Sequence, residues 1–294
     1  MKNFNLSLFF VMLLLIILVS SGGIVEAEDS LFNSNEDAKT DWQKSVVRAK
    51  GYGVVGDNIQ NKAQAKILAR EAAITMAQRH LLEEIKGVNL NATQTIRNAQ
   101  LESDVIKKKL VGTLRGARIV EEKQPAKGTY LVIMEIKFYG KDGVIKAILP
   151  KLEEEAKSSN SNQLQVSNNQ MQTASSSQQK LKDYTGIIIN TINLDVKPAM
   201  APKIYSANGK VVYSVSTLNT KQVITSGIVD YERSVNAAKA NPKVGSNPLI
   251  ISAQDLRGAT KTDLVLSNDT ARKVAQVGRN NNIFKKAKII VVLN

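Results

Sequence analysis

The sequence contains no cysteine, a single histidine and a single tryptophan, and aromatic residues make up only 5% of it. Without cysteine there are no disulfide bonds, thiolate nucleophiles or cysteine-ligated zinc sites. The lone histidine, His80, lacks partners for a typical zinc site, and we expect it to be a packed or partly exposed structural residue. Stability must therefore come from packing, for which a hydrophobic fraction of 43% suffices.

Catalytic motifs are also missing. Neither G-x-S-x-G nor H-E-x-x-H occurs in the sequence. Adjacent carboxylates occur at Glu83-Glu84, Glu121-Glu122 and Glu153 to Glu155, but neighbours in sequence point in different directions on a helix or strand. We interpret these groups as solvated faces. The sequence thus predicts a protein without catalytic residues, cofactor or metal, and a hydrolase with an unrecognised carboxylate pair remains an alternative.

The N-terminal segment has the pattern of a secretory signal peptide. Lys2 precedes an uncharged run from Leu6 to Val19, and Val25-Glu26-Ala27 is a small-x-small cleavage site. The apolar run is shorter than the about 20 residues that span a bilayer, so cleavage near Ala27 is favoured over a retained anchor. A lipid anchor would need a cysteine at that point. We expect residues 1–27 to direct export to the periplasm or cell envelope.

The clearest boundary in the rest of the chain is the segment from Ser158 to Gln179, which is almost entirely Ser, Asn and Gln. Such a composition buries too little apolar surface to offset the entropy of ordering. It predicts a flexible linker over residues 157–182, between one module at 41–156 and another at 183–294. Strand and helix patterns alternate irregularly in both, so we expect an α+β fold in which each module is a mainly antiparallel sheet packed with helices.

The stretch AKGYGVVGD places Gly51, Gly53 and Gly56 at the G-x-G-x-x-G spacing of dinucleotide-binding loops. In such loops the helix begins within the glycine turn, so that its amides meet the pyrophosphate. Here β-type residues continue past the glycines, and the first helix signal is the N-cap residue Asn61. We therefore reject a cofactor site. The glycines instead predict strand bends or close packing against the following helix.

That helix is predicted from Asn61 to Gly87, with small residues recurring at helical spacing. The expected buried stripe comprises Ala65, Ala69, Ala72, Ala73, Met76 and Ala77. A short helix is expected to end at Pro150. In the second module, Asn208-Gly209 between β-rich runs predicts a hairpin with a type I′ turn.

Charge is the remaining signal, since the formal net charge is +14. Lys107, Lys108 and Lys109 precede Arg115 and Arg118, and these five residues are candidate anion-binding residues. A second basic group comprises Arg279, Lys285, Lys286 and Lys288. No aromatic platform for stacking bases accompanies either group, so we do not expect nucleic acid as the partner. Solvated basic faces are the alternative interpretation.

Three stretches of the first module carry a resemblance: AKGYG, AREAAITMAQRHLLEEIKGV and VIKKKLVGTLRGARIVEEKQPAKGTYLVIMEIKFYG. From about Ala49 to Pro150 they resemble the Lpp-twenty lipoprotein family and the amino-terminal domain of flagellar assembly protein T. The resemblance implies a compact α+β module in the bacterial envelope and supplies no catalytic residues. The chain departs from the lipoprotein members in lacking the lipidated cysteine.

Together these observations predict an exported, non-enzymatic component of the bacterial cell envelope that acts in binding or assembly. By the resemblance alone, one version of this role is at the flagellum. The alternative is a basic module that binds lipid headgroups, wall polymer or nucleic acid through its charge. The expected partners are envelope proteins or anionic envelope polymers, with peripheral membrane contact, and the sequence leaves the oligomeric state open.

Overall fold

The computed structural model describes residues 36–55, 59–126, 128–159 and 183–294. Residues Asp37–Asn294 form one compact unit. The predicted signal peptide, residues 1–27, lies outside the described residues, as does most of the predicted linker. Within the described ranges, no helix combines the length and apolar character needed to cross a membrane.

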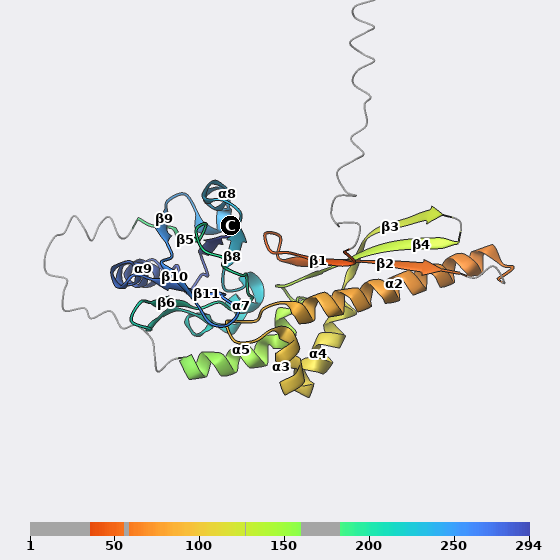
Figure 1. Ribbon diagram of the computed structural model, residues 1–294, viewed down its shortest axis with the longest axis horizontal. Helices are drawn as coiled ribbons and strands as arrows, with labels where there is room; N and C mark the ends of the chain where they lie inside the picture. Colours follow the sequence, from red (N-terminus) through yellow and green to blue (C-terminus); the bar gives the residue numbers. More distant parts are fainter. Residues whose placement is uncertain (1–35, 56–58, 127, 160–182) are drawn as a thin grey trace, which may run out of the picture. The chain divides into compact units, whose positions relative to one another are not determined.

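The first module contains four strands and four helices in the described residues. They are β1 (Ala38–Asp41), β2 (Val46–Val54), α2 (Lys62–Gly87), α3 (Ile96–Glu102), α4 (Asp104–Leu114), β3 (Arg118–Ala126), β4 (Thr129–Lys137) and α5 (Ile145–Ser159). The strands pair in the order β1-β2-β4-β3, and every pair is antiparallel. Figure 1 shows α2 running beside this sheet, as expected for an α+β module.

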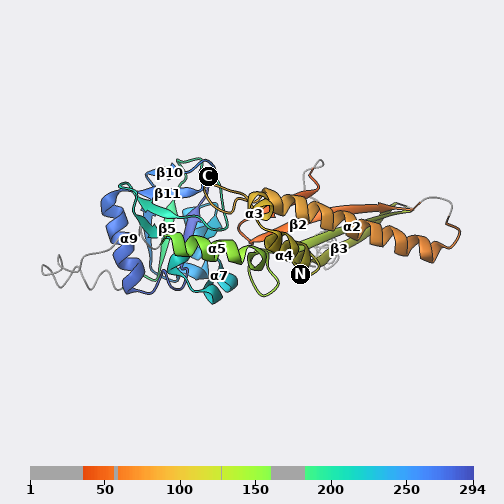
Figure 2. The same cartoon turned by 90° about the horizontal axis from the view of Figure 1, so that it is seen from below.

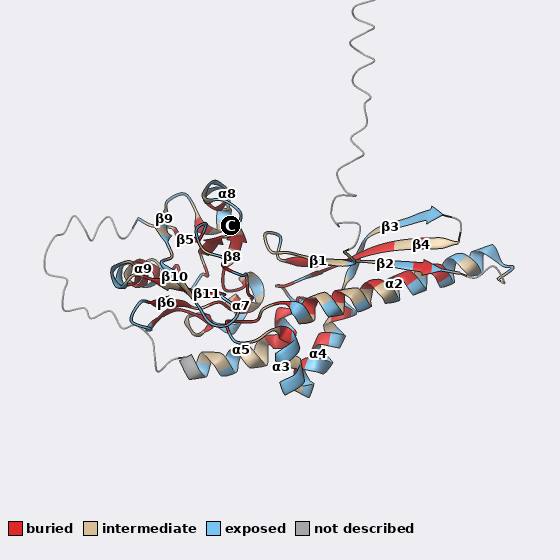
Figure 3. Cartoon of the chain, viewed as in Figure 1, coloured by how far each residue is buried: buried red, intermediate tan, exposed pale blue. Residues whose placement is uncertain are grey.

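The long helix α2 begins as the sequence predicts. The side chain of Asn61 accepts hydrogen bonds from the amides of Ala63 and Gln64, and Gly87 is the last helical residue. The buried face is displaced slightly from the predicted one, because Ala72 is exposed and the stripe continues to larger residues. It comprises Ala69, Ala73, Ala77, Leu81 and Ile85. Figure 3 shows buried positions, in red, recurring along α2.

Two glycines of the G-x-G-x-x-G motif lie inside β2, and both are packed against α2. A Cβ atom on Gly51 would lie 2.1 Å from the carbonyl oxygen of Ala73, and one on Gly53 would lie 1.9 Å from that of Ala69. Strand and helix therefore touch backbone to backbone along the contact visible in Figures 1 and 2. The predicted role of these glycines in close packing is confirmed; Gly56 lies outside the described residues.

The second module is built from two small sheets and short helices. Its elements are β5 (Gly186–Asn190), β6 (Ile204–Ser206), β7 (Val211–Tyr213), the 3₁₀ helix η4 (Val215–Thr217), α7 (Thr220–Ser226), β8 (Asp230–Glu232), α8 (Val235–Ala240), the 3₁₀ helix η5 (Pro242–Val244), β9 (Pro248–Ser252), β10 (Asp255–Arg257), β11 (Asp263–Leu266), α9 (Asn268–Asn280) and β12 (Ile289–Val292). The sheets have the strand orders β8-β12-β5-β9 and β10-β11-β6-β7.

The α+β class is confirmed, but strand direction in the second module differs from the expected mainly antiparallel pairing. In the sheet β8-β12-β5-β9 every pair is parallel, and β6 also pairs with β11 in parallel. The reason lies in the central strands, where β5 is almost entirely buried and β12 completely so. Strands covered on both faces read as continuous apolar runs, which is typical of parallel sheets.

The hairpin predicted at Asn208-Gly209 is present, and its turn differs from type I′. Strands β6 and β7 pair antiparallel around it, and Gly209 has a φ of +81°. Asn208 is not among the residues with positive φ, whereas a type I′ turn needs positive φ at both central positions. The amide of Gly209 donates to the carbonyl of Ser206 at 2.8 Å, so the left-handed glycine is the last residue of a four-residue turn that begins at Ser206.

The two modules share one hydrophobic core, and α5 helps to join them. The helix contacts α4 of the first module and both η4 and α7 of the second. It continues through Pro150 to Ser159, beyond the predicted end, and so takes in Lys157, the first residue of the predicted linker. Proline removes one backbone hydrogen bond, but the helix that continues past it buries Leu152 completely.

Direct contacts also link the modules outside α5. The amide of Gly140 donates to the carbonyl of Ile224 at 2.7 Å, and that of Met200 to the carbonyl of Asn89 at 3.0 Å. The ring of Trp42 lies edge-on to that of Tyr231, with centroids 5.4 Å apart. The position of each module against the other is therefore fixed by specific backbone and aromatic contacts.

Candidate functional site

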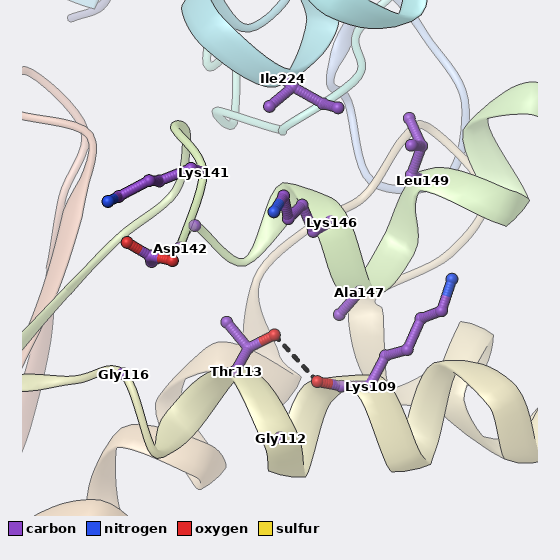
Figure 4. Close-up of a pocket in the computed structure, with 11 residues that line it drawn as sticks. Lys109, Gly112, Thr113, Gly116, Lys141, Asp142, Lys146, Ala147, Leu149 and Ile224 are labelled. Atoms are coloured by element: carbon purple, nitrogen blue, oxygen red, sulfur yellow. Dashed lines mark hydrogen bonds between the residues drawn. The ribbon is translucent and has the colours of Figure 1, made fainter.

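A cavity of about 490 Å³ opens between α4, the loop from β4 to α5, α5 itself and α7 (Figure 4). We call it the lysine cavity. Its lining residues are Lys109, Gly112, Thr113, Gly116, Lys141, Asp142, Gly143, Lys146, Ala147, Leu149 and Ile224. The cavity thus combines residues from both modules, with Ile224 contributed by the second.

The loop that carries Lys141 is held by backbone contacts. The amide of Ile145 donates to the carbonyl of Phe138 at 2.9 Å, which closes the loop onto the end of β4. Within it, a Cβ atom on Gly143 would lie 2.6 Å from the same carbonyl oxygen, so only glycine fits there. On the opposite wall, Lys109 belongs to the regular helix α4. The lysines therefore project from a fixed backbone.

Three lysines line the cavity. In the view of Figure 4, Lys146 lies between Lys141 and Lys109, and the side chain of Lys141 extends away from the other two. Among the described residues, none of the three lies within 4.0 Å of a carboxylate. Asp142 is the one acidic residue in the lining, so the local charge is positive. Such a site attracts an anion and can donate several charge-assisted hydrogen bonds to it.

The inner wall of the cavity is apolar. Ala147 is fully buried, and Leu149 and Ile224 are partly buried beside it. Lysine ammonium groups above aliphatic side chains suit an anion that carries an apolar portion, because each part of the ligand then meets its complement. The arrangement favours an amphiphilic anion over a compact inorganic one.

The structure brings one of the five predicted anion-binding residues into this cavity. Lys109 lines it, whereas Lys107 and Lys108 are exposed on α4 outside the lining. Arg115 is the exposed C-cap residue of α4 and also lies outside the lining. The linear run of basic residues is therefore divided between a cavity wall and open surface.

Arg118, the fifth predicted residue, is engaged elsewhere. Its Nε donates to Oε1 of Glu135 at 3.2 Å, and Nε of Arg48 donates to Oε2 of the same carboxylate at 2.9 Å. Burial acts to raise the pKa of Glu135, but the hydrogen bonds from the two arginines outweigh it and lower that pKa. Arg118 thus neutralises a buried charge in the sheet.

Sequence reasoning did not find Lys141 and Lys146, because each is an isolated lysine separated from Lys109 by two strands. Their shared position arises from the return of the chain along β4 into α5. The feature of the sequence that could have indicated this loop is the segment Gly140 to Gly143, where two glycines flank a charged pair between a strand and a helix.

His80 has the structural role that the sequence predicts. Its Nδ1 lies 2.8 Å from the carbonyl oxygen of Lys50, and the side chain is 23% exposed. The described part of the chain contains no group of three or more His, Asp or Glu residues able to hold a metal ion. His80 is not among the residues that line the lysine cavity, and neither observation identifies a metal site there.

A similarity to a known protein family covers the second module. Residues 186–294 match the family model of the second domain of Treponema pallidum Tp0624. The matched range begins at the first residue of β5 and runs to the end of the printed sequence. No curated protein matches the chain. The description of this family names no ligand and no activity. The segment from Gly186 onward is therefore described only as similar to the second domain of Tp0624.

Proposed function

We propose that this protein is an exported, non-enzymatic component of the bacterial cell envelope that binds anionic lipid headgroups through the lysine cavity. The observation that carries the proposal is the presence of three lysines, Lys109, Lys141 and Lys146, in the lining of a cavity that also has an apolar wall. Export rests on the signal-like segment Met1 to Ala27. The resemblance of the first module to the Lpp-twenty family supports an envelope location and stays part of the proposal.

A second basic cavity favours an extended anionic surface, rather than a single small ligand, as the binding partner. A cavity of about 490 Å³ is lined by Lys243, Lys286 and Lys288 among others. Lys243 is paired with Asp230 at 2.6 Å, which leaves Lys286 and Lys288 as its outward charges. Helix α7 contributes Ile224 to the lysine cavity and the next two residues to this hollow. Two basic hollows thus flank one helix, and a layer of headgroups would meet both.

Vesicle sedimentation tests the proposal. The chain without residues 1–27 should bind vesicles of phosphatidylglycerol and phosphatidylcholine at low salt and should not bind vesicles of phosphatidylcholine alone. A lysine near an anionic surface contributes about 1 kcal/mol. We therefore expect the triple variant K109Q/K141Q/K146Q to bind about 100-fold more weakly.

The matched control is K62Q/K66Q/K239Q, which has the same net charge and alters exposed lysines on α2 and α8. It should retain nearly all of the affinity. Equal losses in the two triple variants would show that total charge, rather than the cavity, drives binding. Tight binding to soluble polyphosphate with none to vesicles would replace the lipid by a polymeric anion.

A further inference from the structure

A second cavity, of about 470 Å³, lies where the two modules meet, and we call it the junction cavity. The residues that line it come mainly from the loop between α2 and α3, from α5, and from strands β6, β10 and β11. Its lining includes Asn91, Glu155, Lys203, Tyr205, Arg257 and Asp263. Its volume falls at the lower end of the range of about 300–1,000 Å³ that is usual for small-molecule sites.

Contacts between the modules fix the walls of this cavity. The hydroxyl of Thr260 donates to the carbonyl of Asn91 at 3.0 Å, and the amide of Ala201 donates to the carbonyl of Leu90 at 2.8 Å. The amide group of Asn91 in turn donates to the carboxylate of Glu155. The cavity is therefore a built feature of the fold rather than a gap between loosely placed parts.

Asp263 supplies a buried negative charge. The residue is 4% exposed, and its Oδ1 accepts a hydrogen bond from the amide of Lys203 at 2.9 Å. Among the described residues, no ammonium or guanidinium group lies within 4.0 Å of its carboxylate. Burial raises the pKa of Asp263 to about 6, which is the expected result of a carboxylate without a close counter-charge.

Arg257 supplies a positive charge in the same cavity. Its guanidinium carbon lies 4.6 Å from the centre of the Tyr205 ring, a cation–π arrangement that fixes the group in place. No carboxylate of the described residues lies within 4.0 Å of it. The ammonium of Lys203 lines the same cavity, 3.8 Å from a carboxylate oxygen of Glu155.

Two ion pairs of the lining, Lys203–Glu155 and Lys151–Glu154, are formed within the protein. Among the described residues, Asp263 and Arg257 of the same lining have no oppositely charged group within 4.0 Å. Charges that serve only to join the modules would be expected to pair, because a buried carboxylate without a partner is costly. A ligand that carries both charges would neutralise Asp263 and Arg257 at once. The cavity is too small for a folded partner and suits a molecule with its own ammonium and carboxylate.

We propose that the junction cavity binds a small zwitterion of amino-acid or dipeptide size. The ammonium group of the ligand binds Asp263, and its carboxylate binds Arg257 and Lys203. This site is separate from the lysine cavity and does not depend on the proposed lipid binding.

Isothermal titration calorimetry of the chain without residues 1–27 tests the proposal. The probes are glycine, alanine, glutamate, lysine and the dipeptide Ala-Ala. At least one should bind, and we test the tightest binder again with its amine acetylated and with its carboxylate converted to an amide. Each modification removes a charge-assisted hydrogen bond and should weaken binding about tenfold or more.

Two variants assign the charges of the ligand to residues. D263N keeps an acceptor for the Lys203 amide and should bind the free and the acetylated probe alike. R257Q leaves Lys203 in the cavity and should discriminate less strongly than the unmodified chain between the free acid and the amide. The controls D195N and R272Q alter exposed residues outside the cavity and should behave as the unmodified chain.

Thermal unfolding establishes that every variant is folded. The proposal is overturned if no probe binds at millimolar concentration, or if D263N and R257Q retain full discrimination between the free and modified probes. Vesicle binding is measured on the same variants and should not change, so failure at this site is distinguishable from failure of the lipid proposal.

Discussion

Two buried carboxylates, one in each module, have pKa values that are shifted in opposite directions. Glu135 on β4 is 3% exposed, and Asp263 on β11 is 4% exposed. The pKa of Glu135 lies below its ordinary value, because hydrogen bonds from Arg118 and Arg48 outweigh the effect of burial. Burial raises the pKa of Asp263 to about 6. Depth of burial alone therefore does not decide the charge of a carboxylate in this fold; the neighbouring cations do.

Strand register explains the pairing of Glu135. Arg48 on β2 and Arg118 on β3 are its directly opposite partners on the two neighbouring strands. Residues opposite each other in an antiparallel sheet lie close enough for ion pairs, so the fold itself places both arginines. Asp263 stands instead at the first position of β11, beside the junction cavity. The first carboxylate is structural, and the second is placed where a ligand can reach it.

The substitution with the largest expected effect acts on the strand that holds Arg48. In G51A, the new Cβ atom would meet backbone atoms of α2 at 2.1 Å and 2.3 Å, so strand and helix must separate. We expect the free energy of unfolding to fall by more than about 3 kcal/mol, measured by urea denaturation. The control G87A places a Cβ where no atom lies within 4 Å. Equal stability of G51A and G87A would contradict the close packing of β2 and α2.

The next prediction removes the charge of the paired carboxylate. E135Q keeps the shape of the side chain but leaves two guanidinium groups without their anion, and we expect a loss of about 2 to 3 kcal/mol at pH 7. The stabilisation by Glu135 is present above its ordinary pKa of 4.5 and is lost as the pH falls through the lowered value. The difference between wild type and E135Q should therefore shrink in acid.

The control for E135Q is E154Q, because Glu154 is 71% exposed and pairs with Lys151 in solvent. Exposed pairs of this kind contribute less than about 1 kcal/mol. Urea denaturation at pH 7 and at pH 3 measures both variants. A loss in E154Q as large as that in E135Q would remove the distinction between buried and exposed pairs.

Local features of the fold could be predicted from the sequence, since they depend on near neighbours. The N-cap Asn61, the helix end at Gly87 and the close packing of Gly51 and Gly53 were predicted and are confirmed. The hairpin at Asn208-Gly209 was also predicted, though its turn type was wrong, because the left-handed conformation is confined to the glycine. Residue type specifies such features directly.

The sites could not be predicted in the same way. Lys109 joins Lys141 and Lys146 only after β3 and β4 return the chain to α5. The junction cavity requires Asn91 of the first module to lie beside Asp263 of the second, which follows from the docking of two modules. The parallel pairing of β12 with β5 and β8 was also missed, because continuous apolar strands give no alternation from which to infer direction.

The smallest expected effect is that of D263N, which should raise the free energy of unfolding where E135Q lowers it. It is the sharpest test of the comparison between the two carboxylates. Asp263 has an ordinary pKa of 3.8, which burial raises to about 6, with Lys203 and Arg257 lowering it and Glu155 raising it. Between these values the unfolded chain releases a proton that the folded chain keeps, so stability falls as the pH rises. The difference corresponds to roughly 3 kcal/mol, of which the new amide of D263N should recover about 2.

D263N should therefore be more stable than wild type at pH 7 and about equal to it at pH 4, as measured by urea denaturation at both values. E135Q changes in the reverse direction over the acid range, so the two variants form a pair with opposite slopes. A destabilised D263N at pH 7 would mean that Asp263 is ionised and well paired in the folded chain. A stabilising loss of charge would agree with a role of Asp263 in binding, because functional sites often cost a protein stability.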